Sequence, residues 1–371
     1  MMTQGQIEIQ LITTVVAVAC ALPGTFLVLR KMAMMSDAIS HAILPGIVIG
    51  FFLTHDLNSP ILILAASVTG VLTVMLVEVL TKTRLFKEDA AIGLVFPILF
   101  SIGVVLIARF AGDVHLDTDA VLLGEPAFAP FDRFVIADRD LGPRSLYVMG
   151  AVGLLNALFI AGLYKELKLA TFDAGLAAAL GFAPMMIHYA LMTLISITAV
   201  AAFDAVGAIL VVALMIGPGA TAYLLTDRLG WMLGISVLVG MASAVSGFWL
   251  AHMLDASIAG AMATMVGFFF TGTYFLAPRH GVIAAMLRRR RNKWVFAEKM
   301  LTIHLLNHEG LAEAEQENRI AHLEEHLSWE SAFARRIVKH AQDDDLVRRF
   351  DGYLELTEQG RDLARQTIVE T

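Results

Sequence analysis

Asp37 and His41 are the residues whose types and spacing could do chemistry inside an apolar segment. They lie four residues apart in the sequence MSDAISHAILPGIVIG, residues 35–50. On a helix, side chains four residues apart share one face, so the carboxylate and the imidazole could hold one ion together. Ionisable groups inside a membrane span are costly and are functional hypotheses by default. A purely structural hydrogen bond between the two side chains is an equally open interpretation.

The donor atoms restrict the kind of ion. Nitrogen and oxygen donors without thiolate suit Mn(II), Fe(II) or Zn(II), and two ligands need a further carboxylate, imidazole or water to hold such a metal. Pro45 and Gly46 lie one helical turn beyond His41, and we expect them to bend or loosen the helix there. A bent helix would favour a place on a transport pathway.

Composition indicates that the elements positioning this pair are membrane helices. Of 371 residues, 57% are hydrophobic and 16% are charged, which is unusual for a soluble protein. The single cysteine, Cys20, excludes a disulfide within the chain and Cys-rich metal sites. Apolar runs of about 20 residues can cross a bilayer, and the sequence predicts nine: Ile7 to Leu29, Met34 to Leu53, Pro60 to Leu80, Ile92 to Phe110, Leu146 to Leu163, Met185 to Phe203, Val206 to Thr226, Trp231 to Leu254 and Ile258 to Ala277. We interpret the first as a retained helix, because it lacks the features of a cleavable signal peptide.

Basic residues predict the orientation of these spans. With the N-terminus outside, 13 of the 17 Lys and Arg residues before residue 292 fall in cytoplasmic segments. Basic residues gather on the cytoplasmic side of membrane proteins, so we expect the N-terminus outside and the C-terminus in the cytoplasm.

Two loops differ in character. The predicted outer loop, residues 111–145, is rich in Asp and Glu and is either a solvated loop or a docking or ion-attracting surface. In the predicted inner loop, residues 164–184, Asp173 can cap a short helix of small residues that passes Leu180 and ends at Gly181. Such a helix could be pushed by a cytoplasmic partner.

Other polar residues in the spans receive simpler interpretations. Asp204 is expected at the outer junction of the sixth and seventh spans, and the later Gly217-Pro218-Gly219 sequence predicts an interrupted seventh helix. For Glu78 we expect a side chain that reaches the membrane interface, and for His188 core packing or interface anchoring.

Several motifs in order resemble one family of membrane proteins. The motifs are SDAISHAILPG, KEDAAIGLVF, HLDTDAVLLGE, YKELKLATFDAGLAAALG, DAVGAILVVALMIGPGATAYLLTDR and FLAPRHG, between about residues 7 and 285. These motifs and their order are similar to those of permease subunits of ABC transporters that import manganese, zinc or iron(II) into bacteria through the cytoplasmic membrane.

This resemblance implies an all-α polytopic fold like that of the vitamin B12 importer permease. It implies two permeases, from the same or related chains, paired with two ATP-binding subunits and fed by an external metal-binding lipoprotein. By resemblance, Asp37 and His41 match the metal-contacting pair, Asp204 matches an often acidic position near the pathway, and Asp173, Leu180 and Gly181 match the loop that sits on the ATPase. The segment GPGATAYLLTDR is more similar to the manganese and iron branch than to the zinc branch.

Residues 292–371 differ from residues 1–291 and are expected to form a separate cytoplasmic domain. We expect helices over Trp294 to Asn307, Leu311 to Leu327 and Ser331 to Gln342, a strand over Gly352 to Leu356, and a helix over Glu358 to Ile368. This pattern resembles a winged-helix domain, as in iron- and manganese-dependent repressors.

The charge of this tail disfavours nucleic-acid binding. It holds ten Lys and Arg against sixteen Asp and Glu, a net charge of −6, whereas affinity for nucleic acid depends on neutralised phosphates. We expect a docking or regulatory module instead. His304 with His308, and His322 with His326, repeat the four-residue spacing and could sense internal metal, or could simply be solvated surface histidines.

Two classes of function stay open from the sequence. The first is a transport subunit that moves a divalent metal, most simply Mn(II) or Fe(II) and alternatively Zn(II). The chain has no GxxxxGK[ST] phosphate loop, so ATP would be bound by a partner only, and no bound cofactor is expected. The second is a membrane-anchored metal sensor whose soluble tail is the output. An enzyme is not expected, because no span or loop assembles a nucleophile with its base.

Overall fold

The computed structural model describes residues 3–55, 59–110, 125–136, 139–311, 314–320, 322–323, 327 and 329–369. Contacts divide the chain into two compact units, Met1–Gly281 and Val282–Thr371. The division falls ten residues before the point where the hydrophobicity of the sequence drops, because one helix runs without interruption from Val282 into the core of the second unit.

The described part of the first unit contains nine helical segments that are long and apolar enough to cross a membrane, as the sequence predicts. The second of these segments is split into two helices. The helices are α1 (Gln4–Leu29), α2 (Ala33–Ala42) with α3 (Leu44–Thr54), α4 (Pro60–Lys82), α5 (Glu88–Phe110), α7 (Arg144–Gly162), α10 (Pro184–Val206), α11 (Ala208–Leu225), α12 (Leu229–Leu254) and α13 (Ile258–Leu276).

Local signals explain where several of these helices begin. Thr3 caps α1 through a capping box, in which its hydroxyl accepts from the Gln6 backbone N–H and the Gln6 side chain accepts from the Thr3 backbone N–H. The Ser59 hydroxyl caps α4. Pro60 lies in the first turn of this helix, where its missing N–H costs nothing. Glu88 begins α5, where a negative charge interacts favourably with the helix dipole.

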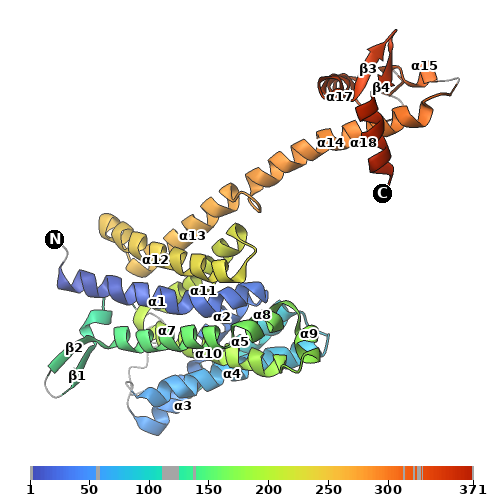
Figure 1. The fold of residues 1–371 in the computed structure, drawn as a ribbon. Coiled ribbons are helices and arrows are strands. Elements are labelled where there is room, and N and C mark those ends of the chain that lie inside the picture. Colours follow the sequence, from blue (N-terminus) through green and yellow to red (C-terminus); the bar gives the residue numbers. More distant parts are fainter. Residues whose placement is uncertain are drawn as a thin grey trace. The chain divides into compact units, whose positions relative to one another are not determined.

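The helices pack in two groups that share α10. Helix α1 lies against α7, α10, α11 and α12, and α13 packs on α11 and α12 (Figure 1). Helices α2, α3, α4 and α5 form the other group, and α10 packs against both α4 and α1. A buried amide reinforces the first group: Asn156 of α7 donates to the carbonyl oxygen of Ala19 at 2.8 Å and to the Thr198 hydroxyl of α10 at 3.0 Å. Such interhelical hydrogen bonds stabilise helix association in membranes.

Helix α11 runs continuously from Ala208 to Leu225, so the interruption expected at Gly217-Pro218-Gly219 is wrong. Small residues there serve close packing instead. A Cβ atom at Gly219 would lie 3.1 Å from the Thr25 Cα of α1, and one at Gly24 would overlap the backbone of Met215. Close backbone approach at small residues is a usual basis of helix packing in membranes, where neighbouring helices also accommodate a proline.

The two ends of the first unit carry different additional elements. One end holds the N-terminus, the short 3₁₀ helix η1 (Ala129–Phe131) and an antiparallel hairpin of β1 (Arg133–Ile136) and β2 (Arg139–Pro143), whereas α8 (Tyr164–Phe172) and α9 (Ala174–Ala179) lie at the opposite end (Figure 1). Arg133 fixes the hairpin to α1 through Glu8 at 2.8 Å. The sequence did not predict these two strands.

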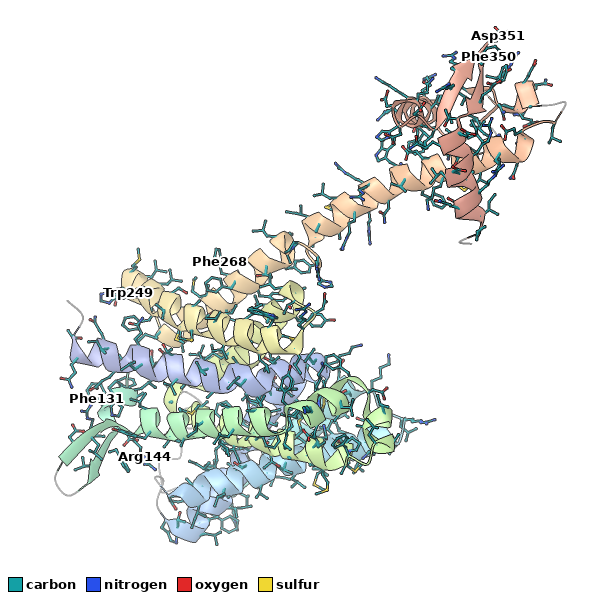
Figure 2. The ribbon with its side chains drawn as sticks, viewed as in Figure 1. Phe131, Arg144, Trp249, Phe268, Phe350 and Asp351 are labelled. Carbon is teal, nitrogen blue, oxygen red and sulfur yellow. The ribbon has the colours of Figure 1, made fainter. Side chains whose placement is uncertain are left out.

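Many large apolar side chains of the first unit face outward. Figure 2 shows Trp249 and Phe268 projecting from α12 and α13, and both are exposed. Exposed apolar side chains along spans of this length fit contact with lipid. The chain is therefore a membrane-embedded helical protein.

The second unit is a small domain around one apolar core. It consists of α14 (Val282–His308), α15 (Ala314–Glu317), α17 (Ser331–Asp343), a hairpin of β3 (Val347–Phe350) and β4 (Tyr353–Leu356), and α18 (Glu358–Val369). Leu301, Ile337 and Leu354 are among its fully buried residues.

The predicted third helix, strand and last helix of this domain are present. Strand β3 was not predicted, although Asp351-Gly352 is a strong hairpin signal: both residues have positive φ, as a two-residue type I′ turn requires. Part of the predicted helix from Leu311 to Leu327 lies outside the described residues. Membership of the winged-helix class stays a prediction.

Candidate metal pathway and coupling site

Asp37 and His41 share one face of α2, as their spacing predicts. His41 Nε2 lies 3.7 Å from Asp37 Oδ1, which is too long for a strong hydrogen bond. The side chains of His41 and Asp37 are 37% and 42% exposed in the single chain. The pair is therefore loosely joined and open on one side.

The helix break predicted beside the pair is present. Helix α2 ends at Ala42 and α3 begins at Leu44, with Ile43 between them. Pro45 has no N–H to donate to the carbonyl oxygen of His41 four residues earlier, and its ring crowds that carbonyl group. The break thus leaves one more oxygen atom without its usual helical donor at the level of the pair.

Aromatic side chains of α5 enclose His41 on one side. The imidazole lies 5.9 Å from the Phe96 ring in a tilted arrangement and 6.3 Å from the Phe100 ring edge-on. These contacts orient the imidazole, and they leave the carboxylate side of the pair open.

The structure does not bring Asp204 next to Asp37 and His41. Asp204 lies in the last turn of α10, where the charges that act on it belong to Asp132 and Arg144, beside the β1–β2 hairpin. Asp37 lies in the first half of α2, shortly after Arg30, whose side chain contacts Thr171 of α8. The role of Asp204 as a metal-contacting residue stays a prediction, and Asp204 would belong to a separate stage of a pathway.

The short capped helix expected after Asp173 is present as α9. The Asp173 carboxylate accepts from the Leu176 backbone N–H at 2.8 Å. Leu180 ends the helix, and Gly181 has a φ of 87°, a conformation that favours glycine. The Phe182 N–H returns to the Ala177 carbonyl oxygen at 3.0 Å, which completes the C-terminal turn. Leu180 is exposed, and the docking of this helix on a partner stays a prediction.

A buried polar network beneath α8 and α9 was missed by the sequence interpretation. Glu78 of α4 lies 2.6 Å from His188 Nε2 of α10, and it accepts from the Tyr189 hydroxyl at 2.7 Å and from Lys82 Nζ at 3.3 Å. The Glu78 and His188 side chains are only 21% and 16% exposed. Neither is an isolated anchoring residue, because each is the other's partner across 110 residues of sequence.

Arg30 extends this network to α1 and α8. Its Nη1 lies 2.8 Å from His188 Nδ1 and its Nε donates to the Thr171 hydroxyl at 3.3 Å. A guanidinium has no acceptor, so His188 Nδ1 accepts and the imidazole proton lies on Nε2, facing Glu78. Burial lowers the pKa of the Arg30 guanidinium. The network joins four helices at the α8–α9 end. It can be recognised only from contacts between residues that are distant in the sequence.

Two of the sequence motifs meet at the loop after α11. Asp227 contacts His280 Nε2 at 3.1 Å and Arg279 Nη1 at 3.3 Å. The hydrogen bond from His280 is the main reason that the pKa of Asp227 is lowered, and Arg279 adds to it. The motifs GPGATAYLLTDR and FLAPRHG are therefore linked through their last charged residues.

The histidines of the second unit pair locally. The His304 and His308 rings lie 4.5 Å apart, and His308 Nδ1 donates to the His304 carbonyl oxygen at 2.9 Å. His322 Nε2 lies 3.7 Å from Glu317, and His326 is outside the described residues. Metal sensing by these four residues stays a prediction.

Comparison with known proteins places the chain in a family. Residues 6–277 match the ABC 3 transport family. The chain is 48% identical over 363 residues to the zinc transport system membrane protein TroD of Treponema pallidum, covering 97% of this chain and 98% of that protein. This alignment includes most of the C-terminal unit. The manganese transport system membrane protein MntD of Bacillus subtilis is 46% identical over 273 residues, 74% of this chain and 92% of that protein.

A solved structure agrees with the fold. PsaBC from Streptococcus pneumoniae in complex with Fab superposes with a TM-score of 0.63 at 29% identity, covering 75% of this chain and 94% of that one. The chain therefore belongs to the ABC 3 transport family, as the membrane permease of a metal ABC transporter in which ATP is hydrolysed by a separate subunit.

Proposed function

We propose that this permease carries a divalent transition metal inward and that Asp37 and His41 contact the ion on its way. The observation that carries the proposal is the half-exposed pair within an apolar span. Charged groups within a span are costly in contact with lipid, so we infer that this face borders a water-filled pathway or a second permease.

The local geometry supports a site that binds the ion only transiently. Two side-chain ligand atoms 3.7 Å apart give an incomplete shell, and the His41 carbonyl oxygen, which receives no N–H from Pro45, could add to it. Water or a second permease copy would supply the remaining ligands. A transport site must be weak enough to release the ion, and an incomplete shell provides this.

The donor set favours a particular range of metals. Imidazole with carboxylate and carbonyl oxygen suits Mn(II), Fe(II) and Zn(II) and lacks the sulfur that Cu(I) prefers. We propose Mn(II) or Fe(II) as cargo, with Zn(II) as the alternative. Of the two relatives, one is named a zinc transport protein and the other a manganese transport protein.

The ends of the first unit support an orientation and a set of partners. We propose that α9 docks on an ATP-binding subunit in the cytoplasm, since Leu176, Leu180 and Phe172 expose apolar surface there. The β1–β2 end would then face outward and receive metal from an external binding lipoprotein. The C-terminal unit would lie in the cytoplasm, in agreement with the excess of basic residues in the predicted inner loops.

Uptake by the assembled complex tests this function. The permease, with its ATP-binding subunits and binding protein, is placed in proteoliposomes with ATP inside, and radioactive manganese, iron and zinc are supplied outside. We expect ATP-dependent accumulation of at least one metal, with manganese or iron ahead of zinc. Accumulation of none by a complex that hydrolyses ATP and retains all its subunits would refute the proposal.

A further inference from the structure

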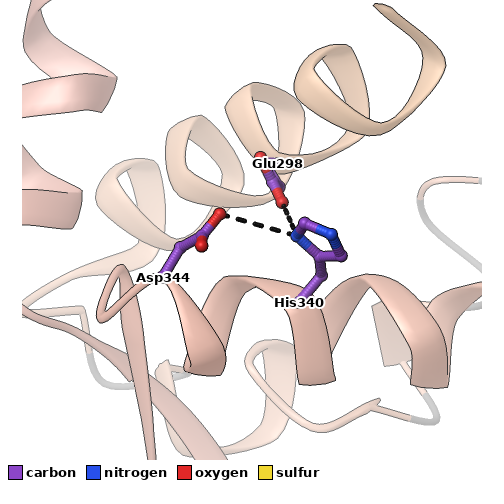
Figure 3. Close-up of side chains that lie close together, drawn as sticks. All are labelled: Glu298, His340 and Asp344. Atoms are coloured by element: carbon purple, nitrogen blue, oxygen red, sulfur yellow. Dashed lines mark ion pairs between the residues drawn. The ribbon is translucent and has the colours of Figure 1, made fainter. Parts of the chain in front are cut away.

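A second group of metal-binding side chains lies in the C-terminal unit. His340 Nδ1 is 2.7 Å from Glu298 Oε1 and 3.5 Å from Asp344 Oδ2 (Figure 3). Among the described residues, these three form the one set of three His, Cys, Asp or Glu residues whose ligand atoms all lie within 4.8 Å of one another.

Two packed helices hold the three side chains in place. Glu298 lies on α14, His340 on the last turn of α17, and Asp344 ends α17 four residues later. The helices pack through buried apolar residues of the domain core, including Leu301 and Ile337. The separation of the ligands is thus set by the core of the domain.

Trp294 fixes the orientation of the imidazole. Its ring stacks on His340 with the centroids 5.8 Å apart and the planes 20° from parallel. In this position Nδ1 faces both carboxylates. The ring orientation is therefore held by packing as well as by charge.

The burial of Glu298 points to a ligand. Its side chain is 9% exposed, whereas those of His340 and Asp344 are about half exposed. Oε1 is buried, and although it lies close to His340 Nδ1, the alignment does not make a hydrogen bond; no other described residue supplies one. A buried carboxylate without a hydrogen-bond donor is costly unless a cation compensates it.

We propose that Glu298, His340 and Asp344 bind one divalent transition-metal ion in the C-terminal unit. Two carboxylates with one imidazole suit Mn(II), Fe(II) or Zn(II), and the imidazole disfavours Mg(II) and Ca(II). The exposed side of the group leaves room for water to complete the coordination. The bound ion joins α14 to α17 and so stabilises this unit. This site is independent of the transport assignment, because it uses no residue of the membrane unit.

The two histidine pairs of the same unit have a different character. The His322 and Glu317 atoms are 3.7 Å apart, and His308 already donates to a backbone carbonyl. His322 therefore provides a matched control: it is a histidine beside a glutamate in the same unit and lies outside the group of Glu298, His340 and Asp344.

Titration of the full chain in nanodiscs with Mn(II) tests the proposal. Free Mn(II) is measured by electron paramagnetic resonance, and Trp fluorescence is recorded in parallel. We expect Glu298→Gln and Asp344→Asn each to weaken one binding event by at least about tenfold. His322→Ala should leave that event unchanged. Excess Mg(II) should not displace the bound ion.

Fluorescence distinguishes this site from the membrane pair. Paramagnetic Mn(II) at His340 should quench Trp294, so the quenching should persist in Asp37→Asn and disappear in Trp294→Phe. The proposal would be overturned if Glu298→Gln and Asp344→Asn both bound Mn(II) with the stoichiometry and quenching of the wild type. The three residues would then form an ion pair only. Loss of binding in His322→Ala, with normal binding in Glu298→Gln, would also overturn it.

Discussion

Two carboxylate–imidazole pairs near the helix ends of the membrane unit have opposite character. Asp37 and His41 come from adjacent turns of one helix, are 3.7 Å apart and are more than one third exposed. Glu78 and His188 come from different helices, are 2.6 Å apart and are mostly buried. The second pair is hydrogen-bonded by Tyr189, Lys82 and Arg30.

The comparison teaches that residue type alone does not identify a pathway site. A pair that is mostly buried and held by Arg30, Tyr189 and Lys82 offers little access to a cargo ion, whereas a loosely joined, more exposed pair beside a helix break can accept one. We therefore assign metal contact to the first pair and the joining of helices to the second.

The largest effect is expected at Asp37. Asp37→Asn keeps the shape of the side chain and removes the charge that attracts the ion, so metal uptake should fall about a hundredfold, or about 2.7 kcal/mol in free energy. The melting temperature of the purified permease in detergent should stay within about 2 °C of wild type, because a half-exposed side chain contributes little to stability. A marked loss of stability would make the pair structural.

Next in size is the effect of Glu78→Gln on stability. The change removes the charge that faces His188 and accepts from the Tyr189 hydroxyl, and weakening a largely buried network of this kind should lower the free energy of unfolding by about 2 kcal/mol. Thermal unfolding in detergent measures it. Lys82→Met is the control, because the exposed ion pair of Lys82 should contribute about 0.5 kcal/mol or less. Equal destabilisation by the two variants would remove the distinction between buried and exposed partners.

A smaller effect is expected at α9, for which we propose docking on the ATP-binding subunit. Asp173→Ala removes the N-terminal cap, which costs about 1 kcal/mol and should reduce ATP-driven uptake about fivefold without changing metal binding. Ser257→Ala removes the comparable cap of α13 and serves as the control. If the two variants reduce uptake equally, α9 has no special part in coupling.

The smallest effect is expected at Asp204. Because Asp204 lies near the β1–β2 end, its charge should assist arrival of the ion, and Asp204→Asn should raise the KM for metal about threefold at low salt. The maximal rate should be unchanged. A fall in maximal rate like that of Asp37→Asn would place Asp204 in the same site as the pair.

The sequence predicted features that depend on neighbouring residues. Apolar runs predicted nine spans, Pro45 predicted the break after α2, and Asp173 with Gly181 predicted a short capped helix. Each of these signals acts within a few residues of the chain. The distribution of charge and the order of the motifs were enough to identify the family.

Features that depend on distant residues were not predictable in the same way. Glu78 and His188 looked like separate anchors because their sequence positions do not indicate contact, and Glu298 is similarly far from His340 and Asp344 in the chain. Pro218 was misinterpreted because its tolerance depends on the packing of α11 against α1 and α13. Tertiary contacts decide all three cases.

The most direct test of the account is to compare His41→Ala with Glu78→Gln in one uptake assay. Both variants are assembled with their partners in proteoliposomes, and ATP-driven metal accumulation is divided by the amount of intact complex. The account predicts near-complete loss for His41→Ala with ATP hydrolysis retained, and near wild-type accumulation per intact complex for Glu78→Gln. Normal accumulation by His41→Ala, or loss by a stable Glu78→Gln complex, would contradict it.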